Sequence, residues 1–421
     1  MSDIIDELQW RGLVAQTTDE SALREHLAGA PRSIYCGFDP TAPSLHFGNL
    51  VQLIVLRHLQ RAGHRVVCLV GGSTGLIGDP RPTSERLLRT KDETASNVAQ
   101  IQDLVRPFLN FDGDNPAIMV NNLDWTAPIS ALDFLRDFGK HFRVNQMIRK
   151  DAVAARLTSQ EGISFTEFSY QILQALDYLH LSQAENVTVQ TGGQDQWGNL
   201  TAGVDLVHRV QGESVHVLTT PLLTDSSGEK FGKSAGNAIW LSAALTSPYA
   251  FYQYWLNVDD ADVITLVKVF TDLDREAVEE LTTATVEAPF KRAAQSTLAE
   301  HVTTLVHGRA ATEMVQQASR VLFGKADPSS VDSATLLDAT AALPNATIAP
   351  GALIVDALVA TDLAASRGGA RRLIAEGGVS LNNAKVVDAE AVLTPSDFLG
   401  GHVAVLKRGR KSLAALHQRA V

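Results

Sequence analysis

Hydrophobic and polar positions in the first half of the chain alternate in blocks that are typical of strands followed by helices. Apolar runs with the length of buried strands occupy residues 33–38, 64–70, 186–190 and 215–223, and helical patterns lie between them at 49–62 and 197–210. Strand–helix–strand repeats of this kind predict a parallel sheet that is covered by helices. We therefore expect a doubly wound, Rossmann-like α/β domain over residues 1–223.

From residue 247 onward the pattern becomes helical. Helices are predicted at 262–270, 275–287, 289–307 and 310–322, several of them with acidic residues in the first turn. Residues 324–349 are rich in Ala, Ser, Asp and Pro without periodicity, which is typical of a linker. A compact pattern then returns, with a helix at 366–376 and strands at 379–381, 385–387 and 402–406. The expected order is a loop and α-helical domain at 224–323, a linker at 324–349 and a small α+β domain at 350–421.

The composition is that of a globular protein. Of the 421 residues, 45% are apolar and 20% are charged. No apolar stretch approaches the roughly 18 residues that a membrane helix needs, and the first ten residues are acidic, unlike a secretion signal. Two cysteines, Cys36 and Cys68, are too few for a disulfide framework. We expect a soluble, cytoplasmic protein with no membrane partner.

Charge is distributed unevenly along the chain. The net charge is −11, yet residues 350–421 contain nine Lys and Arg against six Asp and Glu, a net of +3, so the preceding residues carry −14. A weakly basic tail is consistent with RNA binding, but taken alone it is more often an ordinary solvated surface.

The first motif with chemical content joins the strand at 33–38 to the next helix, which begins near Gly48. His46 lies where the free N–H groups of a first helical turn favour a phosphate, and Gly48 allows a flat ring to approach the backbone. The alternative is an ordinary capped helix with a histidine facing solvent.

Two glycine-rich loops follow other strands. Residues 71–80 contain four glycines, but their spacing is not that of the dinucleotide motif G-x-G-x-x-G. Asp79 in this loop and Asp195 in residues 192–199 both stand where open α/β sheets bind ligands. Asp79 can hold an ammonium group or cap its loop, whereas Asp195 is suited to the hydroxyls of a ribose. Two such positions on one sheet favour a nucleotide.

Lys230 and Lys233 lie in a Gly- and Ser-rich loop that begins at Thr224. The loop is not a Walker A motif, because residue 227 is Ser where that motif needs Gly. Two lysines three residues apart on such a loop are suited to closing over a polyphosphate, although most lysines of this kind belong to a solvated loop.

A predicted helix at 168–177 carries three polar residues on one face. Tyr170, Gln174 and Asp177 stand at positions i, i+4 and i+7 among Phe, Ile and Leu. A polar face in an apolar helix favours a pocket, unless the three groups satisfy one another.

Taken together, these segments resemble the bacterial-type tyrosyl-tRNA synthetases, a family of class I aminoacyl-tRNA synthetases, over essentially the whole chain and in the same order. HFGN at 46–49 is similar to the class I HIGH signature, and KFGKS at 230–234 is similar to the KMSKS signature. GLIGDP, FTEFSYQILQALD and GGQDQWGN resemble segments specific to the tyrosine enzyme. Residues 366–374 and 379–382 resemble the S4 RNA-binding fold. The resemblance implies a catalytic Rossmann-like domain, an anticodon-binding α-helical domain and an S4-like RNA-binding domain.

The resemblance also implies roles for individual residues. For L-tyrosine these are Tyr35 and Asp177 at the phenol, Asp79, Tyr170 and Gln174 at the ammonium group, and Gln196 at the carboxylate. The residues implied in ATP binding are Cys36, Gly37, Asp39, His46, Gly48, Asn49, Gly193, Asp195, Lys230, Lys233 and Ser234. Those implied in catalysis, at the phosphates, are Thr41, His46, Arg86, Lys230 and Lys233.

The implied reaction has two steps. Tyrosine and ATP form tyrosyl-adenylate with release of pyrophosphate, and the tyrosine then passes to the terminal ribose of tRNA(Tyr). Mg²⁺ is expected to accompany ATP without a tightly bound protein metal, and DNA is not an expected partner. Family members are homodimers, and the matching segments here are residues 134–142 and Phe165.

Two departures from the family pattern stand out. Asn49 replaces the second histidine of the signature, so it can donate a hydrogen bond but cannot become cationic. The loop at 79–86 is about one residue shorter and has no lysine, for which Arg81 is a candidate substitute.

Three alternative functions remain. A tryptophanyl-tRNA synthetase is disfavoured because Tyr35 and Asp177 suit a phenol oxygen. An RNA-binding protein that has lost activity would not need Lys230 and Lys233. An adenylating enzyme that does not act on RNA would not need the S4-like tail.

Overall fold

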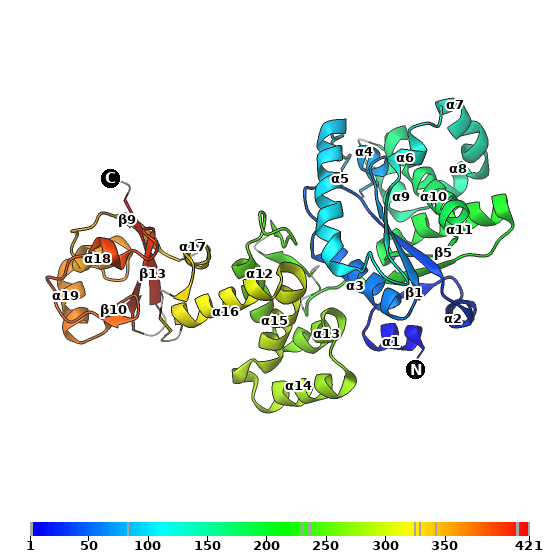
Figure 1. The fold of residues 1–421 in the computed structure, drawn as a ribbon. Helices are drawn as coiled ribbons and strands as arrows, with labels where there is room; N and C mark the ends of the chain where they lie inside the picture. Colours follow the sequence, from blue (N-terminus) through cyan, green and yellow to red (C-terminus); the bar gives the residue numbers. More distant parts are fainter. Residues whose placement is uncertain are drawn as a thin grey trace. The chain divides into compact units, whose positions relative to one another are not determined.

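The chain divides into two compact units in a computed structural model (Figure 1). Unit 1 comprises Met1–Leu245 and Val258–Leu298, and unit 2 comprises Thr246–Asn257 and Ala299–Val421. The structure describes residues 3–81, 84–160, 162–226, 228, 231–234, 237–323, 326–327, 330–341, 343–409 and 412–419.

A six-stranded sheet in the order β1-β6-β5-β2-β3-β4 forms the centre of unit 1. Five of its strands are parallel, and β1 pairs with β6 in the antiparallel direction. The strands are β1 (Gln16–Thr17), β2 (Ser33–Phe38), β3 (Arg65–Val70), β4 (Ile118–Asn121), β5 (Val187–Gly193) and β6 (His216–Thr220). The prediction of a doubly wound α/β domain is confirmed.

The order of the strands places a topological switch point beside β2. The chain leaves β2 for β3 and β4 on one side and later returns to β5 on the other side. Tyr35 of β2 therefore has Val67 of β3 and Gln190 of β5 as its register partners. Ligands of open α/β sheets bind outside the carboxyl ends of the strands at such a point.

Three helices account for most of the packing on the sheet: α3 (Phe47–Arg61), α10 (Phe165–Glu185) and α11 (Trp197–Gln211). Helices α10 and α11 approach closely because Gly203 has no side chain, since a Cβ there would lie 2.9 Å from the Tyr178 ring. The other α-helices of unit 1 are α1 (Ile4–Trp10), α2 (Glu20–Gly29), α4 (Thr74–Ile77), α5 (Lys91–Val105), α6 (Leu123–Thr126), α7 (Ala131–Asp133), α8 (Val144–Met147), α9 (Asp151–Leu157), α13 (Asp260–Phe270) and α14 (Arg275–Glu287). Shorter turns are η1 (Arg106–Phe108), the π-helical η2 (Phe134–Phe138), η3 (Gly139–His141), η4 (Gln194–Gln196) and η5 (Pro289–Lys291), and β7 (Lys233–Ser234) pairs with β8 (Asn237–Ala238).

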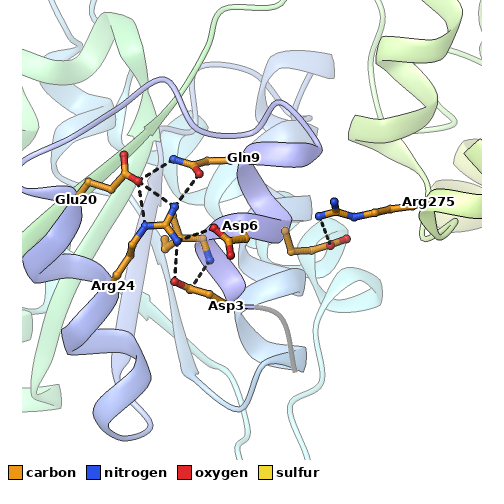
Figure 2. Close-up of polar contacts among 8 residues, drawn as sticks. Asp3, Asp6, Gln9, Glu20, Arg24 and Arg275 are labelled. Carbon is orange, nitrogen blue, oxygen red and sulfur yellow. Dashed lines mark hydrogen bonds and ion pairs between the residues drawn. The ribbon is translucent and has the colours of Figure 1, made fainter.

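Polar contacts attach helix α1 to two neighbouring elements (Figure 2). Arg24 of α2 donates to Asp3 and Asp6 at 2.7 Å each and to Glu20 at 2.9 Å. On the opposite side of α1, Glu7 lies 3.9 Å from Arg275 of α14. These contacts fix α1 between α2 and α14.

Unit 2 contains helices and a second sheet. Its sheet has the order β11-β10-β12-β13-β9, and an apolar cluster under it includes Leu358, Ile374 and Leu406. Its elements are α12 (Pro248–Leu256), the part of α15 (Ala293–His307) from residue 299 onward, α16 (Arg309–Phe323), α17 (Ser333–Thr340), β9 (Asn345–Ile348), α18 (Ile354–Ala360), α19 (Arg367–Ala375), β10 (Val379–Leu381), β11 (Ala384–Lys385), η7 (Pro395–Asp397), β12 (Val403–Arg408) and β13 (Ser412–Gln418). In the part of the chain that the structure describes, no helix is long and apolar enough to cross a bilayer.

The segment predicted as a linker, 324–349, is more structured than its composition indicates. It contains α17 and also β9, which pairs in parallel with β13. The C-terminal sheet therefore begins at Asn345 rather than after residue 350. The pattern fails here because α17 buries only three of its eight residues and β9 only one of its four, so neither has a strong period.

Candidate active site

Asp177 is the most deeply buried charged group at the switch point. It lies on α10 and is 3% exposed. Its two carboxylate oxygens accept hydrogen bonds from Asn122 Nδ2 and Trp125 Nε1, each at 3.0 Å. Burial raises the pKa of Asp177 to about 7, although the two N–H donors oppose this shift. The switch point thus holds a buried carboxylate that titrates near neutral pH.

Two polar groups in the same region lack protein partners. Among the residues that the structure describes, the Tyr35 hydroxyl and Oε1 of Gln174 are buried and accept or donate no hydrogen bond. Tyr35 is 1% exposed, and its pKa is raised by burial and then by the nearby Asp177. Because a buried polar group without a partner is costly, these atoms mark where a polar ligand would bind.

Tyr170 lies on the same helix face, as its spacing from Asp177 predicts. Its hydroxyl donates to Asp39 Oδ2 at 2.8 Å, and Thr74 Oγ1 donates to the other oxygen, Oδ1, at 2.7 Å. Burial raises the pKa of Asp39 against these two hydrogen bonds. Asp39, at the end of β2, is therefore tied to α10 and α4.

Asp79 and Gln196 form a second polar cluster with Asn199. Asp79 accepts from Gln196 Nε2 at 2.8 Å and from Asn199 Nδ2 at 2.9 Å. Lys150 donates to Asn199 Oδ1, and burial lowers the pKa of Lys150 to about 7 against the attraction of Asp79. This arrangement joins the loop after β3 to the start of α11.

The residues predicted at the ribose lie on β2 and at the end of β5. Gly193 is needed where it stands, because a Cβ there would lie 2.6 Å from Asp195 Oδ1. Cys36 is 2% exposed and neighbours Gln52, with 3.9 Å between Sγ and Oε1. Burial raises the pKa of the Cys36 thiol to about 12, so it is not a thiolate. Gly37, beside it, is exposed.

The HFGN motif at 46–49 caps helix α3. Nδ1 of His46 accepts from the Gly48 N–H at 3.0 Å, and Asn49 Oδ1 accepts from the His46 N–H at 3.2 Å. The His46 ring lies close to Gly48, where a Cβ would be 3.0 Å from His46 Cε1. A glycine at this position therefore makes room for the ring. Asn49, which stands where the family signature has its second histidine, thus helps to cap the N-terminus of α3. The helix begins at Phe47, two residues before the predicted start, because of this cap.

The second signature loop packs on the first. Gly232 has a φ of +92°, and a Cβ there would lie 2.7 Å from Cβ of Phe47. The rings of Phe231 and Phe47 are 5.1 Å apart, and the Phe47 N–H donates to Ile239 O at 3.1 Å. The two class signatures are therefore adjacent in space.

The lysines of this loop are only partly described. Lys230 lies outside the described residues. Lys233 and Ser234 form β7, but their side chains are outside what the structure describes.

Thr41 and Arg86 lie on the loops that border the site. The Thr41 N–H donates to Asp39 O at 2.8 Å, and Arg89 donates to Thr41 O. Arg86 Nε donates to Asp79 O at 2.8 Å, so its side chain turns back toward the end of β3.

A cleft of about 520 Å³ opens beside Asp79. Its lining includes Lys150, Gln171, Trp197 and Arg209, from the segment before α9 and from helices α10 and α11. The cleft borders the Asp79 cluster but not Tyr35 or Asp177, so it is a neighbouring space rather than the pocket around Asp177.

Sequence reasoning missed the partners of the predicted residues. Asn122, Trp125, Thr74 and Asn199 all bond predicted site residues but are not predicted themselves, and neither is Lys150, which bonds Asn199. The sequence offered no clear signal for Asn122, because β4, which it follows, has four half-buried residues and no alternation.

The fold and this site define a class I aminoacyl-tRNA synthetase. A family model described as tRNA synthetases class I (W and Y) matches residues 28–324. A second model, described as the tyrosine–tRNA ligase SYY-like C-terminal domain, matches residues 336–416. The chain belongs to the tyrosine–tRNA ligase family and is an aminoacyl-tRNA ligase.

Named relatives agree over nearly the full length. A tyrosine–tRNA ligase of Leifsonia xyli subsp. xyli is 58% identical over 415 residues, which is 98% of this chain and 94% of the relative. One of Streptomyces coelicolor is 54% identical over 417 residues, 99% of each chain. A C-terminally truncated mitochondrial tyrosyl-tRNA synthetase of Coccidioides posadasii matches with a TM-score of 0.66 and 32% identity, covering 75% of this chain and 91% of that one.

Proposed function

We propose that this chain activates L-tyrosine with ATP and transfers it to tRNA(Tyr) at the carboxyl edge of the unit 1 sheet. The observation that carries the proposal is the buried carboxylate of Asp177 beside the unpartnered Tyr35 hydroxyl. A phenol hydroxyl can donate to the first group and accept from the second. Phenylalanine would leave the Tyr35 hydroxyl buried without a partner and would give Asp177 no donor beyond Asn122 and Trp125. Tyrosyl-tRNA synthetases are the usual example of this rule, with discrimination of about 10⁵.

The ammonium and carboxylate groups of tyrosine would bind toward Asp79. Gln174, with its unpartnered Oε1, and the Tyr170 hydroxyl face this side from α10. Asp79 already accepts from Gln196 and Asn199, which hold its carboxylate in place to receive a cation. Gln196 would then direct its amide toward the substrate carboxylate.

ATP would bind across the ends of β2 and β5. Cys36, Gly37, Gly193 and Asp195 would face the ribose, and Asp39 would border it. Gly48 would allow the adenine ring to approach the backbone of α3, whose N-terminus carries a partial positive charge. The remaining groups proposed at the nucleotide are His46, Asn49, Lys230, Lys233 and Ser234.

The first step needs positioning and charge neutralisation rather than a general base. A carboxylate oxygen of tyrosine attacks the α-phosphorus of ATP, and the bond to the bridging oxygen breaks as pyrophosphate leaves with the electron pair. Thr41, His46 and Arg86, with Lys230 and Lys233 from the second signature loop, would stabilise the departing charge. Mg²⁺ would enter with ATP as part of the substrate.

In the second step, a hydroxyl of the terminal ribose of tRNA attacks the carbonyl carbon of the adenylate, and AMP leaves. The cleft beside Asp79 supports an approach from that side, because it borders the end of the site where the carbonyl would lie and includes Lys150 and Arg209. The S4-like domain of unit 2 would hold the more distant parts of the tRNA. We place the protein in the cytoplasm, where its RNA partner is charged.

We further propose a homodimer through unit 1. Apolar side chains on neighbouring segments are exposed to solvent, including Leu132 (79%), Val144 (62%) and Phe165 (68%). Phe138 and Phe142 pack instead against the core of the sheet. Exposed apolar residues gathered in one region typically mark a protein interface, and a second copy is the partner that the family implies.

The substitution Asp177→Ala tests the site assignment. It removes the acceptor for the phenol, and a hydrogen bond to a charged group is worth about 1.5–3 kcal/mol. We expect kcat/KM for tyrosine to fall about 100-fold while KM for ATP changes less than about twofold, measured by amino-acid-dependent pyrophosphate exchange. Asp103→Ala, an 84% exposed carboxylate on α5, is the control. Equal losses for both substrates would contradict the assignment.

A further inference from the structure

A buried ion pair lies directly under the loop that carries Arg86. Arg156 of α9 and Glu167 of α10 are each 1% exposed at the side chain, and Nη1 lies 2.8 Å from Oε2. Neither residue belongs to the site described above. A buried pair of this kind is weak support for stability, since apolar residues of similar volume often serve as well. Its position therefore needs another explanation.

Both members of the pair also bond the loop. We name the described residues 79–81 and 84–86 the arginine loop. Glu167 Oε1 accepts from the Arg86 N–H at 2.7 Å, and Arg156 Nη1 donates to Arg81 O at 3.4 Å. Arg156 Nε donates in addition to Gly162 O at 2.9 Å, which fixes the plane of its guanidinium. The pair thus holds the backbone on both sides of the loop.

The backbones of Arg81 and Arg86 bond the two members of the same ion pair, which holds the two arginines near each other. The nearby guanidinium of Arg86 lowers the pKa of Arg81, and Arg86 also acts on the Asp39 carboxylate at the end of β2. The side chain of Arg86 packs over Gly78, where a Cβ would lie 3.0 Å from Arg86 Cδ. Two cations held near each other beside the nucleotide edge are suited to a polyphosphate.

We propose that Arg156 and Glu167 are positioning residues that hold the arginine loop so that Arg81 and Arg86 both face the phosphates of ATP during adenylate formation. This inference rests on the proposed function of Arg86. In this proposal Arg81 supplies the second positive charge of the arginine loop, which has no lysine. Glu167 also stands one turn before Tyr170 on α10, so the same helix positions the phosphate side and the tyrosine side of the site.

The double substitution R156M/E167L is the direct test. It removes both charges together at similar volume, which avoids leaving one buried charge unpaired. We expect the rate of tyrosyl-adenylate formation to fall 10- to 100-fold, because small displacements of positioning groups have effects of this size. KM for pyrophosphate in the reverse reaction should rise, while tyrosine affinity changes less than about twofold. A purely structural role would not separate these quantities.

The control is the pair at the other end of the same helix. Arg65 and Glu185 lie 3.0 Å apart, and R65M/E185L should leave the kinetics unchanged. In a background that lacks both loop arginines, R81A/R86A, R156M/E167L should add less than about a threefold loss, since the pair acts through these two groups. Arg156→Lys is the second variant if the double variant does not fold. Because lysine cannot reproduce the fork of donors, it should slow adenylate formation about 3- to 10-fold.

The outcomes separate this inference from the proposed function. Wild-type exchange rates in folded R156M/E167L, or in Arg156→Lys where the double variant does not fold, would overturn the inference. Wild-type protein without tyrosine-dependent exchange would instead contradict the proposed function itself. An active wild type, a slowed Arg86→Ala variant and unchanged pair variants would leave the function intact and refute the positioning role alone.

Discussion

At the scale of single residues, we expect the ionisation of Asp177 to control the affinity for tyrosine. Its pKa is raised to about 7 by burial, and Asp39 adds to the rise. Tyr35 and Tyr170, the other titratable groups nearby, have pKa values raised well above the ordinary value and stay neutral. In the proposed site the phenol of the substrate donates to this carboxylate, so we expect binding to need the ionised form.

This yields a pH dependence of known sign. A group with a pKa of about 7 is about one-tenth ionised at pH 6 and about nine-tenths ionised at pH 8. We expect KM for tyrosine to fall about tenfold between these values and to level off above pH 8, measured by pyrophosphate exchange at saturating ATP. A KM that is flat, or that rises with pH, would contradict this account of the pocket.

The principal residues of the site can be predicted from the sequence, but their hydrogen-bond partners cannot. Tyr170, Gln174 and Asp177 share a helix face because helical spacing alone requires it. Asn122 could not be found in the same way, since β4 has four half-buried residues and no clear alternation. Whether each predicted residue touches a substrate stays a prediction, because bonds such as Tyr170 to Asp39 depend on packing between segments distant in the sequence.

At the scale of elements, several strands rich in β-branched or aromatic residues were predicted, and a strand without them was missed. Residues 33–38 form β2 as expected, and 275–287 form α14 as expected. Strand β13 was missed because SLAALHQ contains Ala and Leu, which favour helices, and no β-branched residue. Its identity as a strand follows from its pairing with β12 and β9, which only the fold provides.

Helix α1 offers a test of an element held by charge. Arg24 is about one-quarter exposed and contacts three carboxylates (Figure 2). We expect Arg24→Ala to lower the free energy of unfolding of unit 1 by about 1 kcal/mol at low salt, and by less at 0.5 M salt because exposed charges are screened. Urea unfolding at two salt concentrations measures this. Arg106→Ala, which removes an exposed ion pair elsewhere in unit 1, should have no measurable effect. A loss that is independent of salt would show that packing, not charge, holds α1.

At the scale of the whole molecule, unit 2 attaches its C-terminal sheet to helix α16 through specific contacts. Lys407, which is 7% exposed, donates to Val321 O at 3.1 Å, and Asn383 Nδ2 donates to the same oxygen at 3.0 Å. Asn383 occupies the tight turn between β10 and β11 with a φ of +69°. The last carbonyls of a helix favour a cation, so the α+β domain is anchored rather than freely linked.

Removing the C-terminal domain should separate the two steps of the reaction. Because β9 is a strand of the C-terminal sheet and α17 precedes it in the chain, the cut is best placed after Phe323 rather than at residue 350. We expect the truncated protein to retain tyrosine-dependent pyrophosphate exchange within about threefold and to lose at least about 100-fold in tRNA charging. Unchanged charging would exclude an RNA-binding role for the domain.

The exposed apolar segments of unit 1 predict the state of assembly. Phe165→Asp places a charge where a second copy would bury an aromatic ring, and an unpaired buried charge is costly. We expect the wild type to have the mass of a dimer and the variant that of a monomer by light scattering after gel filtration. Phe290→Asp, on an 82% exposed residue outside these segments, is the control. A monomeric wild type would contradict the proposal.

The central claim is that the pocket around Asp177 and Tyr35 selects tyrosine for adenylation. The most direct measurement is the exchange of labelled pyrophosphate into ATP, run with each of the twenty amino acids and no tRNA. We predict exchange with tyrosine and none above background with phenylalanine or tryptophan. Exchange with tryptophan, or no exchange with any amino acid from folded protein, would contradict the account.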